Sequence, residues 1–182
     1  MRTIGDTFPA CDLEVVEGRD HTRAVRSLPA AAQRGRWRVW FFWPYDFSIV
    51  CPTEVVAFDR RVPDFADRGT EVVGVSVDSV WAHLAWRAHH PDLRDLRIAM
   101  ASDVTRTLVT ALGILDARSG VAMRATFVVD PEGLIRWVGV YDTAVGRSVD
   151  EVMRVLDAPQ TGAPCPCGWQ KGEPTLSDRV VD

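Results

Sequence analysis

Strand-like and helix-like segments alternate along most of this 182-residue chain, and this alternation constrains the fold more than any other feature. The apolar run over residues 37–43 is typical of a buried central strand. A helix is predicted over residues 54–66, and a strand rich in β-branched residues over residues 71–77. Strands separated by a helix favour an α/β fold with a partly parallel sheet, although the pattern alone does not select one α/β arrangement.

The other predicted elements continue the same alternation. Pro63 is expected to kink or break the helix over residues 54–66. Ser148, with Glu151 three residues later, is typical of a capping box at the start of a helix. The remaining predictions are strands over residues 13–16, 98–100, 126–129 and 134–140, a hairpin turn over residues 130–133, and helices over residues 80–89, 104–112 and 148–156.

Composition favours a single folded domain followed by an arm. The hydrophobic fraction of 47% is enough to build one sizeable core in a chain of this length. The segment from Ala158 is rich in Pro and Gly, so we expect a folded domain over residues 1–157 and an extended arm over residues 158–182.

Charge and hydropathy exclude two classes of partner. The formal net charge of −4 gives no electrostatic support to nucleic-acid binding. No apolar run approaches the roughly 20 residues needed to span a bilayer, and residues 1–6 do not have the pattern of a signal peptide. We therefore expect a cytoplasmic protein that binds neither nucleic acid nor membrane.

Cys51 lies between the predicted central strand and the helix that follows it. The positive end of a helix dipole and its free N–H groups favour the thiolate, which is the nucleophilic form of cysteine. Glu54 stands where a Cys-x-x-Cys motif would have its second cysteine, which argues against a dithiol oxidoreductase. A buried structural cysteine is the alternative, and position alone gives the two interpretations about equal weight.

The spacing of Pro44, Ser48 and Cys51 adds a local argument for chemistry. A hydroxyl group three residues before the cysteine can reach the same pocket and hydrogen-bond a bound oxygen. Proline shields such a pocket, because it has no N–H group that would require water.

Residues 41–54, with the sequence Phe-Phe-Trp-Pro-Tyr-Asp-Phe-Ser-Ile-Val-Cys-Pro-Thr-Glu, resemble the active site of the peroxiredoxins. The resemblance covers nearly the whole chain and is closest to typical two-cysteine members, the alkyl hydroperoxide reductase C components of the actinobacterial type. It implies a thioredoxin-like fold, with a central mixed sheet flanked by helices. The other segments that carry it are residues 4–9, 74–79, 85–93, 124–130 and 165–172.

The resemblance assigns roles to the residues around Cys51. It makes Cys51 the peroxidatic cysteine, Arg124 the fixed positive charge, and Pro44 and Ser48 the frame of the pocket. Serine replaces the more common threonine at position 48, which keeps the hydroxyl but removes a methyl group. Glu54 and Arg147 match positions that support the arginine. The alternatives are an ordinary surface arginine at position 124 and solvated salt bridges for Glu54 and Arg147.

The tail carries two further cysteines. The pattern Cys-Pro-x-x-Trp, completed by Trp169, places Cys165 in the resolving position, and Cys167 is an alternative or auxiliary resolving thiol. The implied mechanism is intersubunit, with the sulfenic acid of Cys51 resolved by a C-terminal cysteine of the partner subunit. Half of a zinc site is the alternative for Cys165 and Cys167, but no metal and no cofactor is predicted.

The activity implied by the resemblance is that of a thiol-dependent peroxidase, which reduces hydrogen peroxide and organic hydroperoxides, with peroxynitrite as a further candidate. Its reductant would be a thioredoxin, a flavoprotein reductase or a small dithiol adaptor, and it would form a homodimer that assembles into a ring. A redox-sensing or chaperone-like assembly is the alternative function, and a non-catalytic thioredoxin-like domain is a third. No role is predicted for Cys11, His21, His83, His89 or His90, whereas Trp81 and Trp86 are expected in the core or in subunit contacts.

Overall fold

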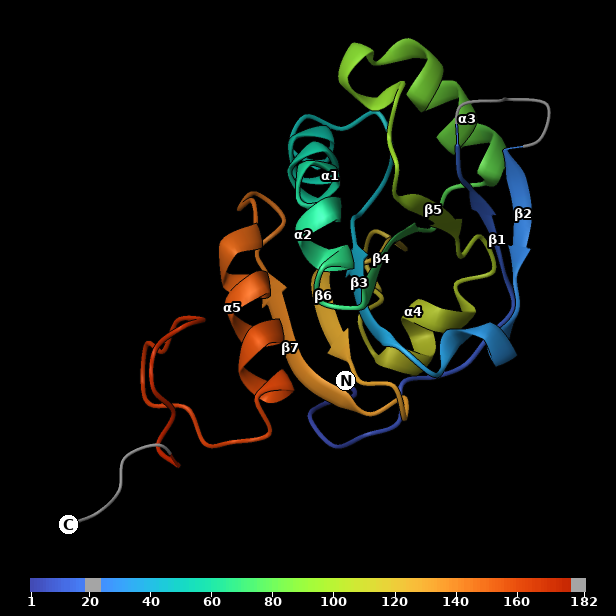
Figure 1. Cartoon of the computed structure of the whole chain (residues 1–182). Helices are drawn as coiled ribbons and strands as arrows, with labels where there is room; N and C mark the ends of the chain where they lie inside the picture. The colour runs from blue at the N-terminus through green and yellow to red at the C-terminus, as the bar shows by residue number, and fades with distance from the viewer. Residues whose placement is uncertain (19–23, 178–182) are drawn as a thin grey trace. The chain divides into compact units, whose positions relative to one another are not determined.

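A computed structural model describes residues 1–18 and 24–177, and it divides the chain into two compact units, Met1–Arg147 and Ser148–Asp182. The larger unit is built on a mixed sheet with the strand order β2-β1-β5-β4-β3-β6-β7 (Figure 1). Strand β4 pairs in parallel with both β3 and β5, and the remaining pairs are antiparallel. The strands are β1 (Leu13–Val16), β2 (Val25–Leu28), β3 (Trp37–Phe42), β4 (Thr70–Ser76), β5 (Ala99–Ser102), β6 (Arg124–Val129) and β7 (Ile135–Tyr141).

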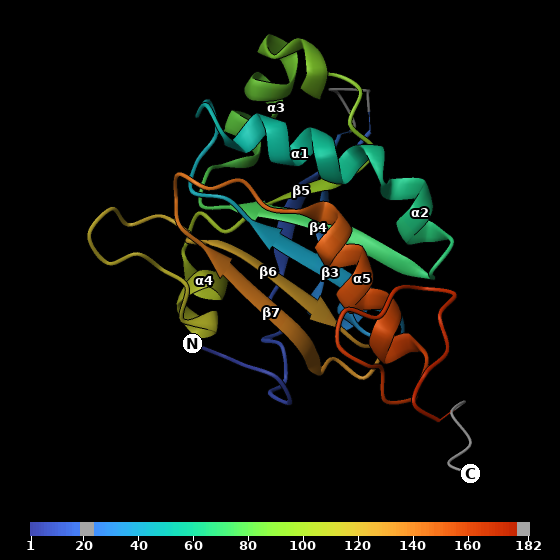
Figure 2. The same ribbon diagram turned by 90° about the vertical axis from the view of Figure 1, so that its left-hand side faces the viewer.

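Alternating side chains on β3 bury both faces of this sheet. Phe42 belongs to the main core cluster together with Leu108 of α4, whereas Phe41 stacks on Phe58 of α1 at a centroid distance of 4.2 Å. Helices α1 and α2 therefore lie on one side of the sheet and α4 on the other (Figure 2). The helices of this unit are α1 (Cys51–Arg60), α2 (Val62–Ala66), α3 (Val80–His89) and α4 (Thr107–Leu112), with short 3₁₀ turns at η1 (Ala30–Gln33) and η2 (Pro91–Leu93).

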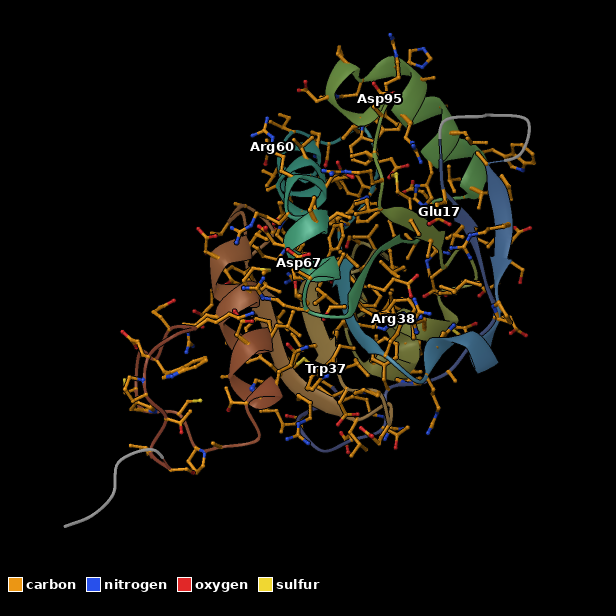
Figure 3. The ribbon with its side chains drawn as sticks, viewed as in Figure 1. Glu17, Trp37, Arg38, Arg60, Asp67 and Asp95 are labelled. Carbon is orange, nitrogen blue, oxygen red and sulfur yellow. The ribbon has the colours of Figure 1, made fainter. Side chains whose placement is uncertain are left out.

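The central strand β3 carries a buried charged side chain. Arg38 on β3 is 2% exposed, and its guanidinium contacts Glu71 of β4 and lies over the Trp40 ring. In Figure 3, Arg60 and Asp67 lie instead at the C-terminal ends of α1 and α2. Arg38 can be buried because its charge has an opposite partner and an aromatic surface.

The predicted α/β class, with a mixed sheet flanked by helices, is confirmed, and the differences are mostly in element boundaries. The break expected near Pro63 occurs at Arg61, which separates α1 from α2 and leaves the proline in the first turn of α2. Helix α4 begins three residues later than predicted, because the Asp103 carboxylate accepts hydrogen bonds from the N–H groups of Leu108 and Val109.

Strand β2 was not predicted from the sequence. Its two central residues, Arg26 and Ser27, are exposed, so the strand lacks an apolar pattern. It forms at the edge of the sheet through antiparallel pairing with β1. Tertiary pairing rather than local propensity accounts for this element.

The smaller unit contains α5 (Val149–Gln160) and the residues after it. Half of the predicted capping box is present, since the Ser148 hydroxyl accepts a hydrogen bond from the Glu151 N–H at 3.2 Å, whereas the Glu151 carboxylate accepts from Arg154. The helix continues past the predicted end to Gln160, with Pro159 in its last turn, so the extended segment begins later than expected. The division into a domain over residues 1–157 and an arm over residues 158–182 stays a prediction.

Candidate active site

Cys51 is the first residue of α1 and is fully buried. The helix begins three residues before the predicted start at Glu54, which places the cysteine inside the first turn. No side chain caps this helix end, Pro52 has no N–H group, and the Thr53 N–H donates to the Val50 carbonyl at 3.1 Å. The partial positive charge of a helix N-terminus favours a thiolate at this position.

Arg124 begins strand β6 and points its guanidinium at the sulfur. Its Nη1 atom lies 3.6 Å from Cys51 Sγ and also contacts the Glu54 carboxylate, while Nη2 donates to the Thr143 carbonyl at 2.8 Å. The side chain is almost fully enclosed, which excludes the interpretation of an ordinary surface arginine. Burial alone would lower the pKa of Arg124, but the charges of Glu54 and Cys51 raise it above its ordinary value.

Glu54 joins Arg124 to a second buried arginine, Arg147. The Arg147 side chain donates to both Glu54 oxygens at 2.8 Å, and its backbone N–H donates to Oε1 at 2.8 Å. The Arg147 guanidinium also lies over the Phe41 and Phe58 rings, 5.4 Å and 5.7 Å from their centroids. This pair is therefore not a solvated salt bridge but part of a buried network.

Different effects decide the pKa values of Glu54 and Arg147. Burial alone would raise the pKa of Glu54, but the hydrogen bonds and charge of Arg147, with the charge of Arg124, lower it below its ordinary value. Burial is the largest effect on Arg147 and lowers its pKa despite the nearby carboxylate. The carboxylate is thus firmly ionised and fixes both guanidinium groups.

A pocket of about 520 Å³ opens above the cysteine. Pro44, Ser48, Cys51 and Arg124 all line it, so the structure brings these four predicted residues together. Ser48 Oγ and Arg124 Nε are buried and have no hydrogen-bond partner among the described residues. Buried polar atoms are nearly always paired, so these two atoms are available to a ligand oxygen.

A second cavity of similar size, about 540 Å³, lies between Arg36, Thr70 and Arg97. Its lining contains no cysteine, serine or histidine. We therefore assign the candidate chemistry to the smaller pocket, where the nucleophile and the unpaired polar atoms occur together.

A buried network that the sequence did not predict fixes the loop before Cys51. The Asp46 carboxylate accepts from Trp43 Nε1 at 2.9 Å and contacts His83 Nδ1 at 2.7 Å, and His83 Nε2 lies 3.2 Å from the Ala101 carbonyl. The Asp46 N–H also donates to Asp78 at 2.9 Å. These contacts hold the loop between β3 and α1 on α3 and β5.

One sequence signal and one backbone feature bear on this network. His83 shares a helix face with Val80 and Trp86, at the three-residue spacing typical of a buried stripe, and it is fully buried. Phe47, next to Asp46, has a φ of 57°, a left-handed conformation that is uncommon for a non-glycine residue. The spacing predicts the burial of His83, but nothing in it identifies Asp46 as the partner.

The two tail cysteines belong to the smaller unit and are described within it. Cys165 is half-buried, with its sulfur 3.6 Å from Thr161 Oγ1 and 3.5 Å from the Ala163 carbonyl, whereas Cys167 is exposed. Among residues 1–18 and 24–177, no group of three histidine, cysteine or carboxylate side chains is placed to hold a metal ion. The assignment of Cys165 and Cys167 as resolving thiols stays a prediction.

The remaining cysteine has a different environment. Cys11 is partly buried, and burial, with the nearby charges of Asp103 and Asp12, raises the pKa of its thiol to about 11. Cys11 is therefore a protonated thiol at neutral pH, unlike a reactive cysteine.

The remaining tryptophan and histidine residues of the sequence analysis have different positions. Trp86 is buried as expected for a core residue, whereas Trp81 is 70% exposed. His89 contacts the Ala85 carbonyl through Nδ1 at 2.9 Å, and His21 lies outside the described residues.

Comparison with known proteins identifies the family. Residues 4–138 match the model of the AhpC/TSA family. The chain belongs to this family. It is 48% identical to alkyl hydroperoxide reductase C of Mycolicibacterium smegmatis, over 97% of this chain and 94% of the relative. It is 41% identical to peroxiredoxin-2 of Macaca fascicularis, over 96% of this chain and 90% of the relative.

Solved structures agree with this assignment and confirm the predicted thioredoxin-like fold. Mycobacterium bovis AhpC matches with a TM-score of 0.84 and 44% identity, covering 93% of this chain and 99% of the other. The reduced 2-Cys peroxiredoxin of Plasmodium vivax matches with a TM-score of 0.89 and 31% identity, covering 96% and 93%. The prediction of a peroxiredoxin, a thiol-dependent peroxidase, is therefore confirmed. Within the described part of the chain, no helix has the length and apolar character required to cross a membrane.

Proposed function

We propose that this peroxiredoxin reduces hydrogen peroxide and organic hydroperoxides, with peroxynitrite as a further candidate, through a sulfenic acid on Cys51. The contact that carries the proposal is the 3.6 Å approach of Arg124 Nη1 to Cys51 Sγ. It lies beside two buried atoms, Ser48 Oγ and Arg124 Nε, that lack partners among the described residues. A nucleophile, a fixed cation and free hydrogen-bonding groups in one pocket suit attack on a neutral O–O bond.

In the first step, the Cys51 thiolate attacks one oxygen of the peroxide. An S–O bond forms, the O–O bond breaks, and its electron pair goes to the second oxygen. This oxygen leaves as hydroxide or alkoxide and takes up a proton, while the sulfur becomes a sulfenic acid. The sulfur is oxidised and the peroxide is reduced, so the electrons balance without a cofactor.

Arg124 stabilises the charge that moves during this step. It stays protonated, and its fork of donors can contact both the sulfur and the departing oxygen. The free Ser48 hydroxyl orients the peroxide, and Pro44 covers the pocket without an N–H group of its own.

Glu54 and Arg147 act as positioning residues in this proposal. Glu54 accepts from both arginines, and the Arg147 guanidinium also donates to the Ala125 carbonyl of β6 at 2.8 Å. These bonds connect α1 to the strand that carries Arg124. The support for the role is geometric, because a guanidinium held on one edge has a fixed direction on the other.

The sulfenic acid is then resolved by a thiol of the tail. The sulfur of Cys165, with Cys167 as an alternative or auxiliary thiol, attacks the oxidised sulfur of Cys51 in a partner subunit. A disulfide forms and water leaves. A thioredoxin, a flavoprotein reductase or a small dithiol adaptor then supplies the electrons that restore both thiols.

A homodimer that assembles into a ring would bring these thiols together, with residues 158–182 as the reaching arm. Two exposed features support contacts between copies. Strand β7 has a neighbour on only one side among the described strands. Exposed apolar side chains also lie on the loop before the cysteine, namely Tyr45, Phe47 and Ile49, and on α3, namely Trp81. We place the reaction in the cytoplasm, where thiols are kept reduced.

The test is peroxide consumption under turnover with an excess dithiol. Cys51→Ser is expected to abolish consumption, because serine cannot form a sulfenic acid. Cys11→Ser is the matched control and is expected to leave turnover unchanged, since the Cys11 thiol is protonated and lies outside the pocket. Turnover by Cys51→Ser at the wild-type rate would exclude the proposal, and a single oxidation without turnover would favour the redox-sensing alternative.

A further inference from the structure

The charge at the mouth of the Cys51 pocket differs from the charge at its base. Of the residues that line the pocket, only Arg124 and Asp116 are charged. Arg124 is enclosed and faces Glu54, which also holds Arg147. The charges of these three groups and a Cys51 thiolate cancel, so Asp116 carries the remaining charge of the lining.

Asp116 is held in place by a tight loop between α4 and β6. Its Oδ1 accepts from the Arg118 N–H at 2.9 Å, and its Oδ2 accepts from the Ser119 hydroxyl at 2.8 Å. The Asp116 N–H donates to the Val121 carbonyl at 2.9 Å, which closes the loop. The hydrogen bonds from Arg118 and Ser119 lower the pKa of Asp116, so the group is a carboxylate at neutral pH. Arg118 is exposed and is not part of the lining, although its positive charge also helps to lower the pKa of Asp116.

The rest of the lining suits an apolar group. Tyr45, Ile49, Val50 and Val121 contribute apolar side chains to a pocket of about 520 Å³. This volume greatly exceeds that of hydrogen peroxide, so an organic group attached to the reacting oxygens has room beside Cys51. The pocket therefore combines an apolar wall with one negative charge at its mouth.

We propose that Asp116 is a specificity-determining residue that favours hydroperoxides with an uncharged organic group over those that carry a carboxylate. The proposal rests on the proposed function, because it describes the substrate of the same pocket. An anionic substrate approaching the mouth meets a fixed like charge that is accessible to solvent, so the repulsion is screened by salt. An uncharged substrate of the same shape does not, so the difference appears in the second-order rate of Cys51 oxidation.

The experiment compares a short-chain hydroperoxy acid with its methyl ester, in single-turnover oxidation of Cys51 at low salt. The wild type is expected to react more slowly with the acid than with the ester. Asp116→Asn keeps the side-chain acceptor of the turn. It is expected to raise the rate with the acid by about twofold to fivefold and to leave the rate with the ester unchanged. Added salt is expected to reduce the difference in the wild type but not in the variant.

The control variant is Glu132→Gln, which makes the same change in net charge at an exposed turn outside the pocket lining. Glu132→Gln is expected to leave the acid-to-ester ratio at the wild-type value. An unchanged ratio in Asp116→Asn, or an equal change in Glu132→Gln, would overturn the proposal. Failure of the proposed function gives a different result, because neither peroxide would then oxidise Cys51 in the wild type.

Discussion

The two proposed reacting thiols, Cys51 and Cys165, differ in how far away in the sequence their contacts lie. Cys51 contacts Arg124, which is 73 residues away in the sequence, and the same arginine is bound to Glu54. The contacts of Cys165 come from Thr161, Ala163 and Ala158, none of them more than seven residues away. The first thiol depends on distant parts of the fold, whereas the second depends on its own stretch of chain.

The difference matches the tasks proposed for the two thiols. A thiolate that attacks a peroxide requires a cation at a fixed distance, and buried ion pairs between separate elements provide this. A thiol that must reach a partner subunit requires a segment that can change conformation at low cost, and local contacts allow this. Substitutions in the buried network should therefore lower the free energy of unfolding far more than matched substitutions in the smaller unit.

The largest effect is expected from Glu54→Ala, which leaves two buried arginines without their shared carboxylate. Removing one partner from a buried ion pair typically costs about 3–5 kcal/mol in free energy of unfolding. Glu151→Ala is the matched control in the smaller unit, because Glu151 binds Arg154 in a partly exposed pair. Its cost is expected to stay below about 1 kcal/mol. Urea unfolding of both variants measures the difference, and equal costs would contradict the comparison.

The pH dependence of the free energy of unfolding gives a second test of the role of Glu54. The folded protein holds the pKa of Glu54 below its ordinary value, so the ionised carboxylate stabilises the fold above the pKa of the unfolded chain. This contribution is lost as the pH falls through the folded value. The stability gap between the wild type and Glu54→Gln is therefore expected to narrow as the solution is acidified below about pH 4. A gap that widens in acid would show that the carboxylate is not stabilised by the two arginines.

The next effect concerns Arg124, whose role is to hold charge at the reacting sulfur. Arg124→Ala is expected to lower the second-order rate of Cys51 oxidation by about 10²–10³, as is typical when one charge-stabilising donor is removed. Arg124→Lys is expected to recover only part of the rate, because a single ammonium group cannot replace the fork. Stopped-flow measurement with hydrogen peroxide checks both variants, with circular dichroism to confirm the fold. A wild-type rate in Arg124→Ala would remove the arginine from the mechanism.

Local pattern predicted most of the elements in this chain, but not where several of them end. Residues 13–16 and 80–89 were predicted with the bounds that the structure has, because alternation and a helix cap mark them clearly. The start of α4 was misplaced, since the carboxylate of Asp103 selects the first helical turn. Strand β2 was missed because pairing with β1, rather than its own residues, makes it a strand.

The contacts of the candidate site are harder to predict from local pattern than the elements are. The positions of Cys51 and Ser48 in one pocket follow from their spacing at a strand-to-helix junction. The proximity of Arg124 to Cys51 was predicted only through the family resemblance, since no periodicity relates residues on different elements. Neither spacing nor the family resemblance predicted the pairing of Asp46 with His83, which only the folded chain brings together.

The most direct test of the central claim uses a variant that carries both Cys165→Ser and Cys167→Ser, treated with one equivalent of hydrogen peroxide. If the buried network alone sets the reactivity of Cys51, the rate of its oxidation should stay within about twofold of the wild type. A sulfenic acid on Cys51, trapped and located by peptide mass spectrometry, should then accumulate without any disulfide. A large loss in the oxidation rate, or a disulfide that still forms between Cys51 and Cys11, would contradict the account.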